Sequence, residues 1–235
     1  MNPFVPLQGA ITDSQFLFDR DREVQRVFEL LNCGNSVVLI GEKEVGKSSV
    51  IKAIEQQAKQ KLILPRQTIY LNLATVKNEA DFYFYFCSQL DIEICKGMAL
   101  KRAINRKATP ILLLIDEIDK MIWRGFSQHI THQLRSLAEG KNAPLQLIIA
   151  TTISLENMFP DLKRASLTSY FMGIFAEESI KVWNKPTAYN FIISRLKNTA
   201  VVFTELEIEQ LIQQSKGHPQ KLMSLCHQTY QQYCQ

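Results

Sequence analysis

The sequence predicts an α/β protein whose five-stranded parallel sheet is followed by a small helical region. Three observations lead to this fold class. Short apolar runs alternate with helical patterns along most of the chain, as in repeated strand–helix units. The runs at residues 111–115 and 147–150 are apolar at every position, which is typical of strands buried on both faces of a parallel sheet. Near the end only helical patterns remain, so we expect an α/β core over residues 1–185 and an all-α lid over residues 186–235.

The composition is that of an ordinary globular protein. Of the 235 residues, 46% are hydrophobic and 21% are charged. The net charge of +4 is too small to indicate a nucleic-acid partner. Lysines and arginines recur between residues 96 and 107, and this run could form a basic patch, although on a helix such a run is more often a solvated face.

Cysteine usage and hydropathy indicate the cellular setting. The five cysteines are scattered without Cys-x-x-Cys spacing, which argues against a zinc site and against a disulfide framework. No apolar run approaches the ~20 residues needed to span a bilayer. We therefore expect a cytoplasmic protein with no membrane partner.

The most informative stretch lies between an apolar run at residues 37–40 and a helical pattern that starts near residue 47. Its spacing, Gly-x-x-x-x-Gly-Lys-Ser, is that of the phosphate-binding P-loop. Glycines permit backbone angles that a side chain would forbid, so that N–H groups can converge on a phosphate at a helix N-terminus. Lys47 is expected to reach the β- and γ-phosphates, and Ser48 to ligate Mg²⁺. The predicted nucleotide-binding residues here are Gly41, Glu42, Lys43, Glu44, Val45, Gly46, Lys47, Ser48 and Ser49.

A second informative stretch is the buried strand at residues 111–115, which ends in acidic residues. Doubly wound sheets bind their ligands at the carboxyl ends of such strands. Asp116 is placed to hold Mg²⁺ directly or through water, and Glu117 to orient and deprotonate an attacking water. Asp119 is expected either to support the metal or to cap a helix.

Helical and strand patterns fill the rest of the core. A first helix ends at Gly34 and is expected either to line the base-binding side of the site or to cover one sheet edge. The P-loop helix extends to about residue 61, and a strand follows at 67–73. Five consecutive aromatic residues at 82–86 point all round the next helix, so core packing is favoured over stacking on nucleic acid. A further helix is expected at 98–107.

The last two strands precede the lid. A buried strand at 145–152 ends in two hydroxyl side chains, Thr151 and Thr152. A polar side chain at that place can contact the γ-phosphate or the attacking water, so both are candidate sensors, although hydroxyls also end strands for structural reasons. The fifth strand is expected at 171–175, with an exit at 180–183.

Three helices are expected in the lid, at residues 187–196, 205–215 and 219–233. Gly217-His218-Pro219 separates the last two. Glycine can end one helix, and proline suits the first turn of the next.

Taken together, these stretches resemble the AAA-like branch of P-loop ATPases, and within it the STAND signalling ATPases. The shared features follow one another in the same order. Phe18-x-Arg20-x-x-Glu23 comes first, followed by the P-loop (Walker A) and by the apolar strand that ends in Asp116-Glu117 (Walker B). A strand ending in Thr-Thr and a helical lid carrying Gly-x-Pro complete the order. The resemblance covers residues 16–232. It implies an ASCE/AAA-like strand order, bound ATP or ADP with Mg²⁺, ATP hydrolysis, and nucleotide contacts from His218 and Pro219. The origin-recognition and transposition-regulator ATPases share much of this plan.

Two departures from the STAND pattern affect the functional prediction. Ile153 occupies the place where STAND proteins often carry an arginine sensor. STAND chains also continue beyond the lid, whereas this sequence stops at Gln235, so we expect either a fragment or a separate partner protein.

Two functions follow from these observations. The first is a nucleotide-gated switch that acts through protein partners or self-assembly. The second is a DNA-bound AAA+ ATPase, which needs an arginine finger, for which Arg164 is the candidate, and a basic surface, for which residues 96–107 are the candidate. A degenerate, non-hydrolysing adaptor is a weaker third reading, because the acidic pair Asp116-Glu117 is intact.

Overall fold

The computed structural model describes residues 2–5, 9, 11, 17–122, 125–140, 142–158 and 172–234. Five parallel strands form one sheet in the order β2-β3-β4-β1-β5. The predicted α/β class and five-stranded parallel sheet are therefore confirmed. The strands are β1 (Ser36–Ile40), β2 (Gln67–Asn72), β3 (Ile111–Asp116), β4 (Leu145–Thr151) and β5 (Phe175–Ser179).

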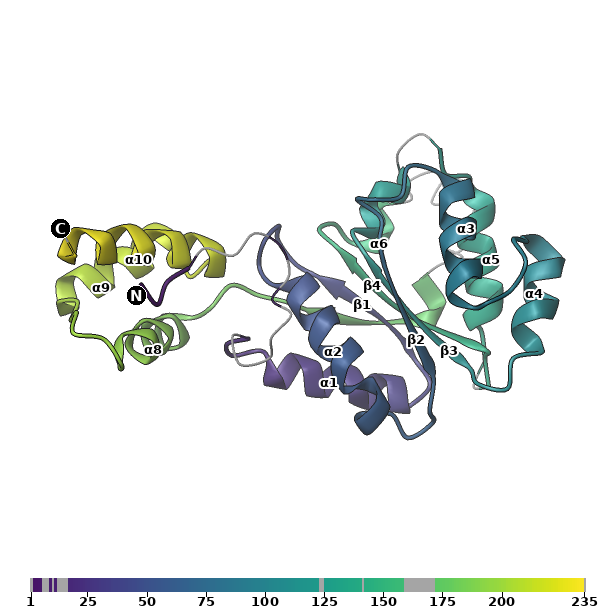
Figure 1. Cartoon of the computed structure of the whole chain (residues 1–235), viewed down its shortest axis with the longest axis horizontal. Coiled ribbons are helices and arrows are strands. Elements are labelled where there is room, and N and C mark those ends of the chain that lie inside the picture. Colours follow the sequence, from purple (N-terminus) through teal and green to yellow (C-terminus); the bar gives the residue numbers. More distant parts are fainter. Residues whose placement is uncertain are drawn as a thin grey trace.

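Helices cover both faces of the sheet (Figure 1). On one face lie α1 (Asp21–Asn32) and α2 (Lys47–Lys61), whose apolar residues form a core with β1, β3 and β4. On the other face lie α3 (Glu79–Gln89), α4 (Gly97–Asn105) and α5 (Gln128–Ala138), which form a second core with the opposite side of the strands. Short helices η2 (Ile118–Ile122), α6 (Leu155–Met158) and η3 (Met172–Ile174) complete the core.

The central strands explain where a site can form. Every residue of β3 and of β4 is buried, as the continuous apolar runs predict. Because all strands are parallel, their carboxyl ends share one edge of the sheet. Asp116 at the end of β3, Thr151 at the end of β4 and the loop after Ile40 of β1 therefore lie close together.

The fifth strand differs from the prediction. The expected strand at 171–175 is wrong: residues 172–174 form η3, residue 171 lies outside the described part of the chain, and β5 starts at Phe175. β5 is the edge strand and pairs with β1. All its residues are half-buried or exposed, and the last three of Phe-Ala-Glu-Glu-Ser are polar, so it carries no continuous apolar run.

The aromatic helix α3 packs as predicted. Phe82, Tyr83 and Phe86 are buried in the core, and Phe84 is 61% exposed. Core packing, not a stacking surface, therefore accounts for most of the aromatic run.

Three helices form the lid: α8 (Lys185–Leu196), α9 (Glu205–Ser215) and α10 (Pro219–Tyr233). Local signals start each of them. The Asn184 side chain caps α8, Thr204 and Glu207 form a capping box at α9, and Pro219 occupies the first turn of α10. No helix of the described residues is long and apolar enough to cross a membrane.

The N-terminal end of the chain packs inside the lid (Figure 1). The Phe4 side chain is fully buried, and its ring centroid lies 6.1 Å from that of Phe191, 5.8 Å from that of Phe203 and 6.3 Å from that of Tyr230. The Asn2 side-chain amide donates to the His227 carbonyl at 3.1 Å. The boundary between core and lid at residues 185 and 186 stays a prediction. Residues 2–5 belong with the lid, because Phe4 packs in the core of the lid.

Candidate functional site

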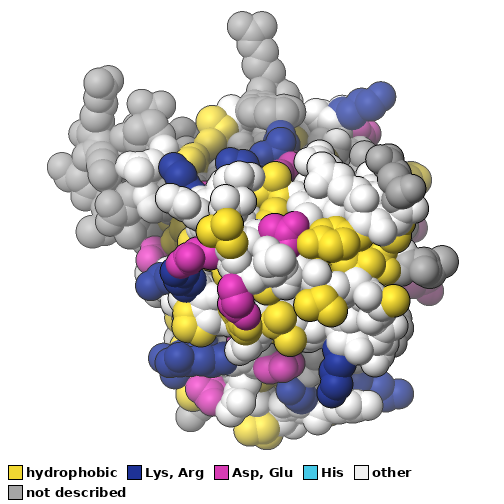
Figure 2. Space-filling view, turned by 90° about the vertical axis from the view of Figure 1, so that its left-hand side faces the viewer, with side chains coloured by type: hydrophobic (Ala, Val, Ile, Leu, Met, Phe, Trp, Pro, Cys, Tyr) yellow, Lys and Arg dark blue, Asp and Glu magenta, His cyan; other side chains and the backbone are white. Residues whose placement is uncertain are grey.

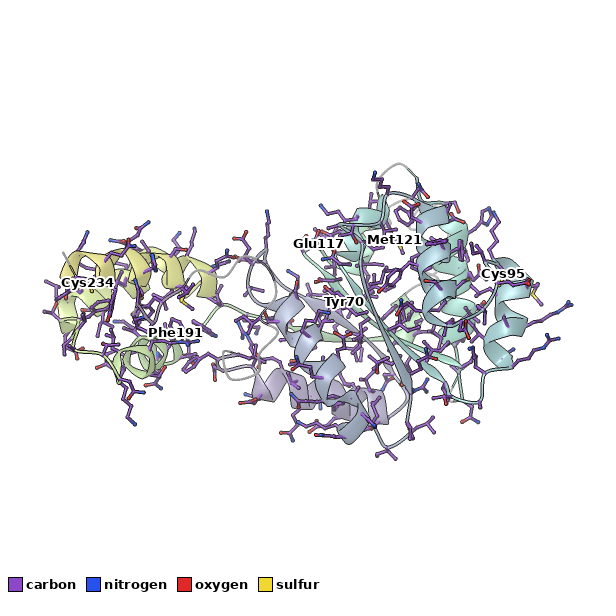
Figure 3. The ribbon with its side chains drawn as sticks, viewed as in Figure 1. Tyr70, Cys95, Glu117, Met121, Phe191 and Cys234 are labelled. Atoms are coloured by element: carbon purple, nitrogen blue, oxygen red, sulfur yellow. The ribbon has the colours of Figure 1, made fainter. Side chains whose placement is uncertain are left out.

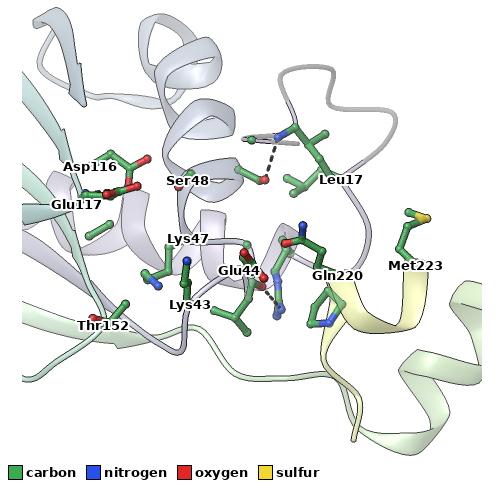
Figure 4. Close-up of a pocket in the computed structure, with 18 of the residues that line it drawn as sticks. Leu17, Lys43, Glu44, Lys47, Ser48, Asp116, Glu117, Thr152, Gln220 and Met223 are labelled. Carbon is green, nitrogen blue, oxygen red and sulfur yellow. Dashed lines mark hydrogen bonds between the residues drawn. The ribbon is translucent and has the colours of Figure 1, made fainter. Parts of the chain in front are cut away.

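A cavity of about 830 Å³ opens at the carboxyl ends of the strands, between the sheet and the lid (Figure 4). Its volume suits a ligand of nucleotide size. One end is polar and is formed by the P-loop and the acidic residues after β3. The other end is aromatic and apolar and is formed by Phe18, Trp183, Phe191, Pro219 and Met223. A molecule with a charged end and a flat ring fits this division.

The two P-loop glycines serve different purposes. Gly46 has a φ of +109°, a left-handed conformation that favours glycine. Gly41 has no such angle, so the expectation of special backbone angles is right for Gly46 and wrong for Gly41. Instead, a Cβ atom at Gly41 would collide with the Ile180 carbonyl oxygen, and glycine allows the loop to pack against the segment that follows β5.

Lys47 is the first residue of α2, and its side chain turns back toward the start of the loop. Its ammonium group is nearly buried and donates to the carbonyl oxygens of Gly41 at 2.8 Å and Glu42 at 2.7 Å. Burial lowers the pKa of Lys47, while the nearby carboxylates, Asp116 first, act against this decrease. A cation held in a pocket by weak carbonyl acceptors can transfer its hydrogen bonds to the stronger acceptors of a phosphate.

Seven of the nine predicted P-loop residues line the cavity, namely residues 43–49. Gly41 and Glu42 are not among the lining residues that the structure describes. Ser48 sits in the first turn of α2 and faces the acidic residues across the cavity (Figure 4). The Ser49 hydroxyl accepts from the backbone N–H of Ile11 at 3.0 Å, so it also ties the N-terminal segment to α2.

The acidic pair lines the same cavity from the end of β3. Asp116 is 2% exposed; its Oδ1 accepts from the Glu117 N–H at 3.0 Å, and its Oδ2 from the Tyr70 hydroxyl at 3.3 Å. The Glu117 backbone is left-handed, with φ of +55°, and its carboxylate lies 3.7 Å from the Lys120 ammonium nitrogen. One carboxylate is thus fixed and buried, and its neighbour is more accessible.

The donor set fits Mg²⁺. Among the described residues no three His, Cys, Asp or Glu side chains gather into a metal cluster. Mg²⁺ does not need one, because it is usually held by one or two protein groups together with phosphate oxygens and water. Asp116 and Ser48, facing the same cavity, supply such a pair.

The two candidate sensors occupy different environments. The Thr151 hydroxyl is buried, donates to the Ile153 carbonyl at 2.8 Å and accepts from the Ile153 N–H at 3.1 Å, so it closes the turn after β4. Thr152 lines the cavity and donates to Asp119 Oδ2 at 2.9 Å. Of the pair, Thr152 is therefore the side chain that a bound ligand can meet.

The lid approaches the P-loop through His218. Its Nε2 lies 2.9 Å from the Lys43 carbonyl oxygen, and because a carbonyl only accepts, Nε2 carries the hydrogen. The Nδ1 atom is buried without a hydrogen-bond partner in the described structure. His218 does not line the cavity, whereas the next residue, Pro219, does. The expected nucleotide contact thus has a geometric basis for Pro219, and His218 contacts the loop backbone instead.

Sequence reasoning noted Arg20 as part of a motif but did not predict what it holds. Its guanidinium is 5% exposed, donates to the carbonyls of Val45 at 3.0 Å and Lys181 at 2.8 Å, and pairs with Glu23 at 2.8 Å. Arg20 therefore joins the P-loop to the segment after β5. The spacing Arg20-x-x-Glu23 was a sufficient signal for the ion pair, because residues three apart on a helix are neighbours.

Neither feature predicted for a DNA-bound ATPase is found among the described residues that line the cavity. The basic run at 96–107 falls on and around α4, at the end of the molecule away from the lid (Figure 1). Arg164, the candidate arginine finger, lies outside the described residues.

A lysine and a serine at the start of a helix, facing a carboxylate pair at the end of another parallel strand of the same sheet, define a P-loop nucleotide-binding protein. The chain matches the AAA domain family over residues 33–159, more than half of its length, and it belongs to that family. It is therefore an AAA-like P-loop ATPase, as the sequence motifs predict.

Individual relatives agree with this assignment. The chaperone protein ClpB 1 of Nostoc sp. is 27% identical over 167 residues, which are 68% of this chain and 18% of the chaperone. A Walker-type ATPase of Pyrococcus abyssi superimposes with a TM-score of 0.67 at 20% identity, covering 94% of this chain and 69% of its own.

Two further solved structures are also similar. The Orc1 protein of Aeropyrum pernix, solved in complex with DNA, gives a TM-score of 0.65 at 16% identity and covers 90% of this chain. AMPPCP-bound DnaA of Aquifex aeolicus gives 0.55 at 17% identity and covers 88%. This chain spans 59% of the Orc1 chain and 60% of the DnaA chain. At these identities the similarity shows a shared fold.

Proposed function

We propose that this protein is a nucleotide-gated switch. ATP or ADP with Mg²⁺ binds in the cavity, and the lid closes on the nucleotide. Protein partners or further copies of the chain then bind the surface that this closure changes. The observation that carries the proposal is the contact between His218 Nε2 and the Lys43 carbonyl. It connects the lid to the phosphate-binding loop itself, so a loop that rearranges around phosphates also moves the start of α10.

The turn before His218 gives the lid a second attachment. Gly217 has a φ of +74°, and its carbonyl accepts from the Trp183 N–H at 2.9 Å. A Cβ atom at Gly217 would collide with the Trp183 carbonyl oxygen, so the turn is seated directly on the linker that leaves the sheet. A ligand that fills the cavity touches the P-loop, this linker and the Pro219 end of α10 together.

The energy for switching comes from binding. A ligand shifts a conformational equilibrium only by its difference in affinity for the two states. At a concentration ~100 times its dissociation constant, a ligand that binds only one state stabilises it by about 2.7 kcal/mol. That is enough to convert a balanced equilibrium into one dominated by the closed lid.

We assign the nucleotide chemistry to residues that line the cavity. Lys47 and the backbone N–H groups of residues 43–48 would bind the phosphates, and Ser48 and Asp116 would hold Mg²⁺, which neutralises phosphate charge. Glu117 accepts the proton of the attacking water. Thr152 is the better placed of the two sensor candidates, because its hydroxyl lines the cavity.

Replacing Glu117 tests the hydrolysis step. Glu117→Gln keeps the shape of the side chain but removes the base, so Mg²⁺–ATP binding should persist while phosphate release stops. Glu93→Gln, at an exposed position before α4, is the matched control and should turn over normally. Turnover of Glu117→Gln at the wild-type rate would exclude Glu117 as the base.

Amide hydrogen exchange tests the switch. With Mg²⁺–ADP the amides of α9 and α10 should exchange more slowly, because the lid is then held against the core, while those of β3 and β4 should not change. Identical lid exchange with and without nucleotide would contradict the proposal, although nucleotide binding itself could persist.

A DNA-bound ATPase is the second candidate, favoured by the similarity to Orc1 in complex with DNA and by the basic residues of α4. Light scattering with ADP and with a slowly hydrolysed ATP analogue, each with and without duplex DNA, separates the two functions. Assembly that requires DNA favours this candidate. An arginine finger at Arg164 would further predict that Arg164→Ala and Glu117→Gln proteins restore activity when mixed.

A further inference from the structure

Tyr70 lines the cavity next to the acidic pair but belongs to neither nucleotide motif. It lies on β2, in the central part of the molecule near Glu117 (Figure 3). The register pairs Tyr70 with Leu114 and Asn72 with Asp116. Since side chains two residues apart share a face of a strand, Tyr70 projects on the same face as Leu114 and Asp116.

The Tyr70 hydroxyl is directed at the metal-binding carboxylate. It donates to Asp116 Oδ2 at 3.3 Å, while Asp116 Oδ1 is occupied by the Glu117 N–H at 3.0 Å. Together the two donors fix the rotation of the carboxylate. The distance of 3.3 Å is longer than the ~2.8 Å typical of O–H···O bonds, and such bonds in catalytic sites often tighten when substrate binds.

A lysine of the P-loop helix contacts the Tyr70 ring. The Lys52 ammonium lies 3.2 Å from the ring centroid and pairs with Glu55 at 2.8 Å. Lys52 is on α2, the helix that begins with Lys47 and Ser48. Tyr70 therefore bridges the helix that carries one predicted Mg²⁺ ligand and the carboxylate that is the other.

From this geometry we infer that Tyr70 is a positioning residue for Mg²⁺, which acts by holding the Asp116 carboxylate in the orientation that the metal needs. The inference rests on the proposed function, because it concerns the same metal. Groups that donate a hydrogen bond to a metal-binding carboxylate fix the orientation of that carboxylate. Their loss typically weakens metal affinity by about 10–100-fold. Tyr70 does not itself contact the metal in this proposal.

The test compares nucleotide binding with and without Mg²⁺ in Tyr70→Phe protein. The dissociation constant of a fluorescent ADP analogue is measured in EDTA and over a Mg²⁺ titration. In Tyr70→Phe the Mg²⁺ concentration at half-effect should rise about 10-fold, while ADP affinity in EDTA should match that of wild type. Tyr83→Phe is the matched control, because that hydroxyl donates to Gln133 Oε1 at 2.7 Å on the opposite face of the sheet and should leave both values unchanged.

A double substitution shows whether Tyr70 acts through Asp116. Asp116→Asn should abolish most of the Mg²⁺ effect, and adding Tyr70→Phe to it should cause no further loss, because coupled residues are not additive. A normal Mg²⁺ titration in Tyr70→Phe would overturn the inference, and so would an equal loss of affinity with and without Mg²⁺. Wild-type protein that binds no ADP under either condition would overturn the proposed function as well, so the two failures are distinguishable.

Discussion

The sheet and the lid of this protein are stabilised in different ways. The central strands β3 and β4 are buried at every position, and residues 111–115 are completely buried between two layers of helices. The core of the lid has two fully buried phenylalanines, Phe191 and Phe4, and Phe4 comes from outside the three lid helices. The sheet can therefore form its core from its own strands and covering helices, whereas the lid needs the N-terminal segment.

The surface of the lid supports this contrast. Seen from the lid end, hydrophobic side chains are scattered among charged ones (Figure 2). Val202 is 76% exposed and Leu206 is 66% exposed, so part of the lid's apolar content contributes nothing to its core. In Figure 3 Phe191 lies within the lid, where the Phe4 ring packs against it at 6.1 Å between centroids. A domain this small and this incompletely packed opens at lower cost than the sheet.

Phe4→Ala is expected to have the largest effect. Removing a fully buried phenylalanine from a core typically costs about 3–5 kcal/mol, which approaches the total stability of a small domain. We expect α8, α9 and α10 to lose their protection against amide exchange while β3 and β4 keep theirs. Nucleotide affinity should fall as well, because the apolar end of the cavity is formed largely by the lid and its linker.

Phe84→Ala provides the matched control for the comparison. Phe84 is 61% exposed on α3, so the same loss of atoms should change the free energy of unfolding by no more than about 0.5 kcal/mol. Uniform loss of protection throughout the Phe4→Ala protein would show that sheet and lid unfold as one unit, and the contrast between them would be wrong.

Lys47→Ala is expected to weaken nucleotide binding at the sheet and to leave the stability of the lid unchanged. We expect nucleotide affinity to fall by roughly 100-fold or more, equivalent to about 2.8 kcal/mol, because the cavity then lacks the buried cation that we propose binds the phosphates. Lid protection without nucleotide should be unchanged, since within the described part of the chain the Lys47 ammonium bonds to P-loop carbonyls and to no lid residue. Titration calorimetry with ATP measures the first effect, and Lys59→Ala, at an exposed position on the same helix, is the control. Unchanged affinity in Lys47→Ala would show that the P-loop does not bind the phosphates.

The parts of the structure that could be predicted from sequence are those in which the informative residues are consecutive. The P-loop spacing and the strand ending at Asp116 predicted the two motifs that the cavity brings together. The helical pattern, with Gly217 and Pro219 between two segments, predicted α9 and α10 at the bounds observed. Local pattern was sufficient there, because turns, caps and buried strands depend on near neighbours.

The parts that were missed depend on distant partners. Phe4 reads as an irregular N-terminal residue, and only the fold brings it to Phe203 and Tyr230. Tyr70 lies near Asp116 because of the register between β2 and β3, and this register cannot be predicted from the sequence of either strand alone. β5 was placed too early because an edge strand lacks the apolar run that reveals a central one.

His218 offers the finest test, because it joins the two regions by a single hydrogen bond. His218→Ala removes the donor to the Lys43 carbonyl, and one such bond contributes about 1 kcal/mol net. The lid should keep its fold, since the His218 side chain makes no capping bond to α10. The coupling between nucleotide and lid should weaken. The factor by which ADP slows amide exchange in α10 should be roughly fivefold smaller than in wild type, while the protection of α10 without nucleotide should change little.

The control for this prediction is His129→Ala, at an exposed histidine on α5 that lies on the far face of the sheet. By reciprocity the loss of coupling should also appear as a decrease of similar size in ADP affinity, because the lid and the nucleotide stabilise each other by the same free energy. A decrease in affinity with full coupling retained would mean that His218 acts on the nucleotide site alone. Full coupling with unchanged affinity would mean that the attachment of Gly217 to Trp183 carries the signal between sheet and lid, and that the histidine contact is incidental.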